Sequence, residues 1–144
     1  PENIALFNKM GVFNEKECIA RTAVLHEHYT GFVELEALTM IDMMQQQVLP
    51  AVRNAKIPEG EDLEAKLSGA VAEVKAGLAK VHAGADAYAK ATAARVLRLE
   101  TMEAARVVCD SAEEVVPADI WPLATYKELL FLDSHQGAEA PIYE

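Results

Sequence analysis

Apolar residues recur at intervals of three and four along most of the chain, the spacing that places side chains on one face of an α-helix. The first such stripe begins after Asn14, which forms a capping-box pattern with Glu17, and it extends to about Asn54. Pro50 is predicted to kink or loosen its last turn, because proline removes one backbone hydrogen bond. The stripe consists of Cys18, Thr22, Leu25, Tyr29, Phe32, Val33, Met40, Ile41, Met44 and Val48.

A second helix is predicted to follow a turn at 56–62, where Pro58 and a cluster of acidic residues suit a helix start. Gly69 and Gly77 lie inside it, and we interpret both as positions where a partner helix approaches closely. Its seam consists of Leu63, Leu67, Ala70, Val71, Val74, Leu78 and Val81.

A third helix is predicted from about Asp86 to Val116, ended by Pro117. The segment 82–86 allows either a turn, with Gly84 after the helix end and Asp86 as the next cap, or one unbroken helix. We expect the turn. The stripe of the third helix consists of Ala91, Val96, Leu99, Met102, Ala105, Val108, Cys109, Ala112 and Val116.

Both ends of the chain add smaller predicted elements. Residues 1–13 are too apolar for a free tail and are predicted to be a docking segment. After an extended stretch at 120–123, Thr125 and Glu128 form a second capping box that opens a short helix through Phe131. The predicted fold is therefore all-α, an antiparallel bundle of three long helices plus a short C-terminal helix. We divide it into a docking segment at 1–13, a helical bundle domain at 14–131 and a flexible tail at 132–144.

Composition narrows the classes of function. The chain has 144 residues with 51% hydrophobic and 6% aromatic residues, as expected of one close-packed helical domain. Its formal net charge of −10 disfavours nucleic acid and anionic membrane surfaces as partners. The first residues form no signal peptide and do not include a starting Met, so we expect an internal fragment of a longer polypeptide. Cys18 and Cys109 are expected to be reduced, in the cytoplasm or another reducing compartment such as an organelle.

Residue patterns that carry chemistry are few. His26 and His28 lie about 200° apart on one helix and do not share a metal; we expect one to be half-buried and the other solvated. A Glu-x-x-His motif, a glycine-rich phosphate loop and a nucleophile elbow are absent from the sequence. We therefore predict no catalytic, cofactor-binding or metal-binding residue. Arg106 and Asp110 are spaced for an ion pair, on a solvated face or at a contact between subunits.

Aromatic residues near the two ends are the candidate interface residues. Trp121, fixed by Pro122, suits either a lid on the core or an interface anchor. Met40, Met43 and Met44 are interpreted as core filler before any binding groove. The possible interface set is Phe7, Phe13, Trp121, Tyr126 and Phe131.

Four stretches, in this order, carry a family resemblance: ALFNKMGVFNEKECIAR at 5–21, ELEALTMIDM at 34–43 with VLPAV at 48–52, E-T-M-x-x-A-R-x-x-C-D-x-x-E at 100–113, and W-P-x-x-T-Y-x-x-L-L-F at 121–131. Together they resemble the C-terminal helical region of type III glutamine synthetases. Residues 55–95 and the end of the chain after Phe131 match least.

The resemblance implies a parent ligase of nitrogen metabolism that makes glutamine from glutamate and ammonia with ATP and divalent metal ions such as magnesium. It implies a large ring-shaped homo-oligomer, with an upstream catalytic domain and other subunits as the partners of this segment. The family's nucleotide, metal and glutamate residues lie in that upstream part, so none is assigned to a position of this chain.

Two other hypotheses stand beside this one. A free-standing helical adaptor would bind partner proteins in a groove lined by methionines, and the reading frame upstream of Pro1 distinguishes it from the ligase. A redox switch between Cys18 and Cys109 is disfavoured, because an up-down-up bundle places the two near opposite ends.

Overall fold

The structure is a computed structural model that describes residues 2–131, except the side chain of Tyr126. Every element that it defines in this range is a helix, as the sequence predicts; the predicted flexible tail at 132–144 lies outside the described residues. The elements are α1 (Glu2–Lys9), α2 (Glu15–Met43), the π-helical turn η1 (Met44–Val48), α3 (Leu49–Ala55), α4 (Gly60–His82), α5 (Ala87–Val96), the π-helical turn η2 (Leu97–Thr101), α6 (Met102–Glu113) and α7 (Tyr126–Leu130).

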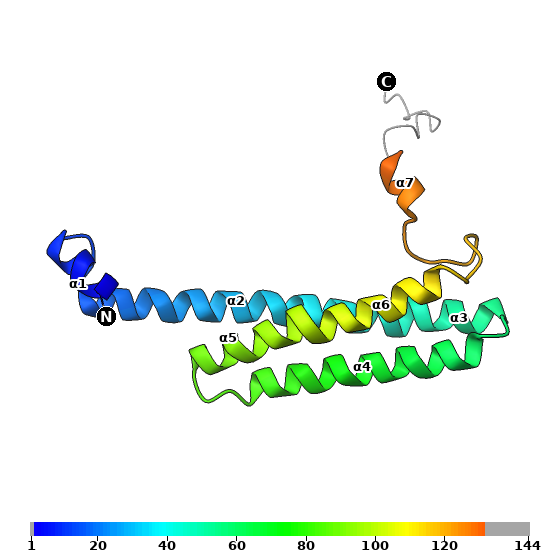
Figure 1. The fold of residues 1–144 in the computed structure, drawn as a ribbon, viewed down its shortest axis with the longest axis horizontal. Coiled ribbons are helices and arrows are strands. Elements are labelled where there is room, and N and C mark those ends of the chain that lie inside the picture. The colour runs from blue at the N-terminus through cyan, green and yellow to red at the C-terminus, as the bar shows by residue number, and fades with distance from the viewer. Residues whose placement is uncertain (1, 132–144) are drawn as a thin grey trace, which may run out of the picture.

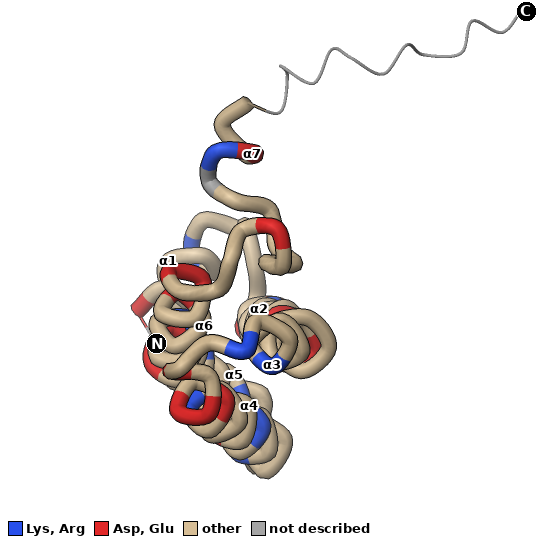
Figure 2. Tube along the Cα trace, turned by 90° about the vertical axis from the view of Figure 1, so that its right-hand side faces the viewer, with Lys and Arg blue, Asp and Glu red and all other residues tan. Residues whose placement is uncertain are grey.

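Three helical rods form the body of the molecule. The first consists of α2, η1 and α3, the second is α4, and the third consists of α5, η2 and α6; successive rods run in opposite directions (Figure 1). Seen end-on, they form a triangle in which each rod contacts the other two (Figure 2). The structure differs from the predicted three long helices plus one short helix. Two of the rods contain π turns, and α1 is an additional helix inside the expected docking segment.

Local side-chain chemistry sets the helix starts. The Glu17 N–H donates to Asn14 Oδ1 at 3.0 Å, and the Asn14 N–H donates to Glu17 Oε2 at 2.7 Å. Thr125 and Glu128 repeat this reciprocal arrangement at the start of α7. Both capping boxes predicted from the sequence are therefore confirmed, and each satisfies backbone donors that a helix start leaves unpaired.

The rod is loosened in the turn before Pro50, and not in its last turn as predicted. The Leu49 N–H donates to the Met44 carbonyl, five residues back, so η1 is a π-helical turn directly before the proline. Proline has no N–H to donate, and the wider turn accommodates that loss without ending the helix. The rod ends instead at Lys56, which caps α3 in the left-handed conformation with φ 50° and ψ 39°.

A turn separates α4 from α5, and the alternative of one unbroken helix is wrong. Asp86 is the N-cap of α5, since its Oδ1 accepts from the Ala89 N–H at 2.7 Å. The role of Gly84 differs from the predicted helix cap, because its φ is not positive. A Cβ at Gly84 would lie 2.8 Å from the Lys90 backbone nitrogen, so this turn requires glycine for the close approach of two backbone segments.

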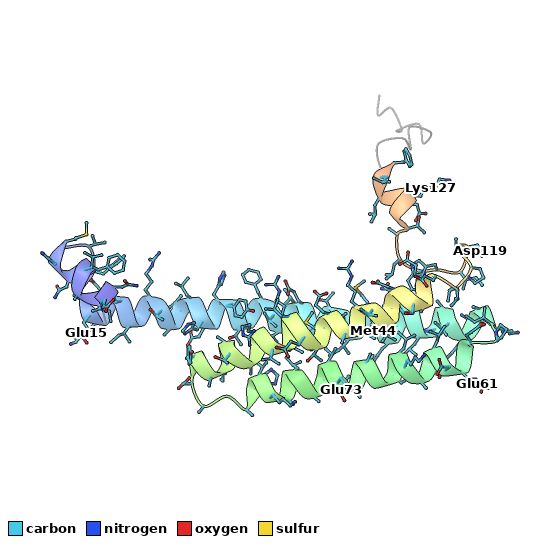
Figure 3. The ribbon with its side chains drawn as sticks, viewed as in Figure 1. Glu15, Met44, Glu61, Glu73, Asp119 and Lys127 are labelled. Carbon is cyan, nitrogen blue, oxygen red and sulfur yellow. The ribbon has the colours of Figure 1, made fainter. Side chains whose placement is uncertain are left out.

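The core lies between the three rods, with Met44 near its middle (Figure 3). The predicted seam of α4 is largely confirmed, but two residues of the third stripe are wrong: Val96 is 39% and Leu99 is 55% exposed. At 100° per residue, Val96 lies about 200° from the fully buried Ala94. Ala94 and Leu97 are the core residues of the third rod that the predicted stripe missed.

Gly69 and Gly77, the two glycines in the interior of α4, have different environments. A Cβ at Gly77 would lie 2.7 Å from Leu97 Cδ1, so the prediction of close helix packing there is confirmed. The same prediction for Gly69 is wrong, because a Cβ there would meet nothing within 4 Å.

After α6 the chain turns and then leaves the bundle. The Ile120 and Trp121 N–H groups both donate to the Pro117 carbonyl, at 2.9 and 3.0 Å, so Ile120 lies in a turn and not in the predicted extended stretch. Trp121 packs into the core, and the following segment carries α7 away from the three rods (Figure 1).

Candidate docking surface

The hairpin of α4 and α5 covers only the C-terminal part of α2. The first buried residue of α2 is Thr30, although the helix begins at Glu15. Figure 3 shows the start of α2, marked by Glu15, beyond the end of the hairpin. The predicted stripe is therefore wrong at Leu25 and Phe32, which are 58% and 54% exposed.

A second apolar row lies on the side of α2 that faces away from the core. Val33 and Ala37 face the core and are 0% exposed, whereas Leu35, two residues beyond Val33 and about 200° around the helix, is 61% exposed. We call this row the outer face of α2 and define it by its exposed apolar residues, Val24, Leu25, Phe32, Leu35 and Leu38.

The helix α1 packs beside the start of α2 and buries none of its own residues. Phe7 and Phe13 meet edge to face with ring centroids 5.9 Å apart, and the Arg21 guanidinium lies 5.5 Å from the centroid of the Phe13 ring. Other apolar side chains of the segment remain open to solvent: Leu6 is 52% and Met10 is 66% exposed. The predicted docking segment thus contacts its own domain and still presents apolar surface.

The other predicted interface residues lie in different surroundings. Trp121 is 8% exposed and belongs to the core, the position expected of a core lid, so we leave it out of the docking surface. Phe131 is 55% exposed and follows α7, where Leu129 and Leu130 are 54% and 60% exposed. Tyr126 is the first residue of α7.

A groove of about 510 Å³ lies between the first rod and α6. Met44 is 1% exposed and lies in the core as predicted, and Met40 is half-buried and packs against that core. Met43 is half-buried in the wall of the groove. We call it the methionine groove; its lining residues are Leu35, Glu36, Thr39, Met40, Met43, Met44, Val48, Met102, Arg106, Cys109, Asp110 and Leu123.

Charged side chains border the methionine groove. Arg106 Nε lies 3.7 Å from Asp110 Oδ2, with both side chains more than half exposed, so this predicted pair lies on a solvated face. Arg98 Nε lies 3.2 Å from Glu36 Oε2 and connects the third rod to α2. Exposed ion pairs of this kind contribute little to stability. The groove therefore has an apolar floor and a rim that carries both positive and negative side chains.

Cys109 lies in the methionine groove, and its surroundings alter the pKa of its thiol. Burial raises the pKa of the Cys109 thiol, and the negative charge of neighbouring Asp110 raises it further. Cys18 and Cys109 are both free thiols. A raised pKa keeps the Cys109 thiol protonated, and a protonated thiol is a poor nucleophile.

We expect slow alkylation of Cys109. Because its pKa is raised, the thiolate fraction at pH 8 is smaller in the folded chain than in the unfolded chain. Iodoacetamide labelling followed by mass spectrometry should show a rate midpoint at higher pH in the folded chain than in urea, and Asp110→Asn should lower the folded midpoint. Equal midpoints in buffer and urea would show that the groove does not desolvate this thiol.

The histidines of α2 are placed as predicted, since His26 is half-buried and His28 is exposed. Within residues 2–131, no three His, Cys, Asp or Glu side chains are grouped in a way that suits a metal ion. Over the same residues, none of the helices has the length and apolar content that crossing a bilayer requires.

Comparison with known proteins connects this helical module to glutamine synthetases. Residues 1–59, which include α1 and the whole first rod, match the family described as the glutamine synthetase C-terminal domain. A glutamine synthetase from Butyrivibrio fibrisolvens is 23% identical over 155 aligned residues, which cover 90% of this chain and 22% of that protein. The chain therefore spans about a fifth of the length of this relative. The two comparisons support a relationship to the C-terminal region of glutamine synthetases.

Proposed function

We propose that this chain is a non-catalytic structural and assembly region at the C-terminal end of a glutamine synthetase of type III. The observation that carries the proposal is apolar surface that the bundle leaves open in three places: on α1, on the outer face of α2 and on α7. Contiguous exposed apolar surface on a folded domain marks sites of contact with other protein. The match of residues 1–59 to the glutamine synthetase C-terminal domain supports the choice of enzyme.

In this proposal the catalytic residues and the assembly surface belong to different parts of the polypeptide. The parent polypeptide forms glutamine from glutamate and ammonia with ATP and divalent metal ions, and an upstream catalytic part supplies the residues for that chemistry. This chain contributes packing. The three rods carry α1 at one end and α7 toward the other (Figure 1). We expect both helices to contact the catalytic part or neighbouring subunits.

The test is made on the polypeptide encoded by the complete reading frame. It should form glutamine and behave as a large homo-oligomer in size-exclusion chromatography with light scattering. Deletion of residues 96–144 removes η2, α6 and α7, and we expect the oligomer to be lost together with the activity. An intact, active oligomer after this deletion would show that the assembly role is wrong.

A second candidate rests on the methionine groove. Methionine side chains adapt to varied apolar partners, and a groove between two helices suits an amphipathic helix of another protein. A start codon close upstream of Pro1, in place of a long catalytic sequence, would favour this adaptor function over the ligase.

A further inference from the structure

We infer that the outer face of α2 is a two-fold contact between two copies of this chain, in which the two α2 helices pack antiparallel about Leu35. This contact deepens the assembly role proposed above, and it rests on that role for its place in the parent oligomer. A second copy is the occupant to which the arrangement of apolar and charged residues on this face points.

The apolar residues of the face form a strip that one helix can cover. His28, Leu35 and Asp42 are spaced by seven residues, which repeats nearly the same direction around an α-helix and forms the central line of the face. Phe32 and Leu38 flank Leu35 on either side of this line, at 54% and 49% exposed. From Val24 to Asp42 the strip is about 27 Å long, at 1.5 Å per residue.

The polar residues on the central line of the face are complementary to those of an inverted copy. A two-fold contact brings the same patch of both copies together, so the residue seven positions before the axis meets the residue seven positions after it. With the axis at Leu35, His28 lies opposite the partner's Asp42, and Asp42 lies opposite the partner's His28. Each copy thus supplies one nitrogen donor and one carboxylate, and both ends of the contact are paired.

Existing contacts hold these two side chains on the outer face. The His28 and Phe32 rings meet edge to face, with their centroids 4.6 Å apart. The Asp42 carboxylate accepts a hydrogen bond from the Gln46 amide on the same helix. Its other oxygen remains as an acceptor for an imidazole N–H.

The face is large enough for a weak specific contact. Each copy contributes five large apolar side chains that are about half exposed or more. Ten such side chains supply on the order of 1,000 Å² of buried surface, the lower limit for a specific interface. A chain with a net charge of −10 otherwise repels its copies, and this strip carries only one acidic residue on its central line.

Sedimentation velocity over a range of concentrations tests the contact on the 144-residue chain. We expect a monomer–dimer equilibrium with a dissociation constant in roughly the micromolar range. Leu35→Glu places two like charges at the axis and should raise this constant at least about tenfold. The control Val107→Glu changes a side chain on α6 that is 63% exposed, and it should leave the constant unchanged.

A charge exchange tests the antiparallel register. His28→Glu alone should weaken the dimer because it places two carboxylates opposite each other, and Asp42→Lys alone should weaken it because it removes the carboxylate that accepts from His28. The double variant places opposite charges at both ends and should return the constant to within about threefold of the original. Positions 28, 35 and 42 are solvent-exposed, so we expect each variant to keep the fold. Thermal unfolding of each variant checks this.

Three results would overturn the inference: a chain that stays monomeric at all concentrations, a dimer insensitive to Leu35→Glu, and a double variant as weak as the single ones. These results are distinct from failure of the proposed function, which appears as a parent polypeptide that forms no glutamine. A monomeric chain whose outer face is nevertheless covered in the parent enzyme would assign this face to the catalytic part.

Discussion

Leu97→Ala should destabilise the domain by about 3 kcal/mol, in the range measured for large-to-small changes in closed cores. Leu97 is 1% exposed and contacts the second rod at Gly77, so its loss leaves a cavity that the rods cannot close. Leu99, two residues on, is 55% exposed, and Leu99→Ala should change stability by no more than about 0.5 kcal/mol.

Urea unfolding followed by circular dichroism measures both Leu97→Ala and Leu99→Ala. The pair is matched in chemistry and differs in burial alone. A larger effect at Leu99 than at Leu97 would mean that the third rod is rotated relative to the arrangement described above.

Gly77→Ala and Gly69→Ala should have opposite effects. Alanine is about 1 kcal/mol more favourable than glycine inside a helix, so Gly69→Ala, which meets nothing within 4 Å, should stabilise the domain by about that amount. At Gly77 the new Cβ would lie 2.7 Å from Leu97 Cδ1, and overpacking of this kind costs about 1–3 kcal/mol. We therefore expect Gly77→Ala to destabilise the domain despite its better helix propensity.

A double-mutant cycle connects the two predictions. In the Leu97→Ala background the methyl group at position 77 has space, so Gly77→Ala should become neutral or stabilising there. If the cost of Gly77→Ala were the same in both backgrounds, the clash with Leu97 would not be its cause.

Local features of this fold were predictable because their causes lie within a few residues. The capping boxes at Asn14 and Thr125, the cap at Asp86 and the loosening of the first rod near Pro50 all depend on neighbours within one or two turns. The π turn η2 has no comparable signal, since no proline follows Leu97–Thr101 closely.

Features that depend on distant parts of the chain were not predictable. Gly69 and Gly77 look alike in the sequence, and only the position of Leu97 across the interface distinguishes them. The stripe on α2 correctly indicated a helix, but it gave no information about how far the hairpin would reach. The outer face of α2 was missed for the same reason, although the seven-residue spacing of His28, Leu35 and Asp42 is visible in the sequence.

The sequence predicted the fold better than it predicted the function. Periodicity and caps predicted the helices, whereas no side-chain constellation in the sequence indicated a chemical activity. The link to glutamine synthetases came from four ordered stretches, and the family match over residues 1–59 supports the first two of them. The exposed apolar surface could be identified only from the structure. Trp121 is buried in the core, whereas Phe32 and Leu35 are exposed, and the sequence does not distinguish them.

Hydroxyl-radical footprinting of this chain, alone and within the purified polypeptide of the complete reading frame, tests most directly whether its exposed apolar surface is covered in an assembly. We expect Phe32, Leu35 and Leu130 to be oxidised more slowly in the complete polypeptide than in a dilute solution of the isolated chain. Tyr88, which is 68% exposed and lies outside the docking surface, should be oxidised at the same rate in both. Equal rates at Phe32, Leu35 and Leu130 in the two samples would contradict the assembly role.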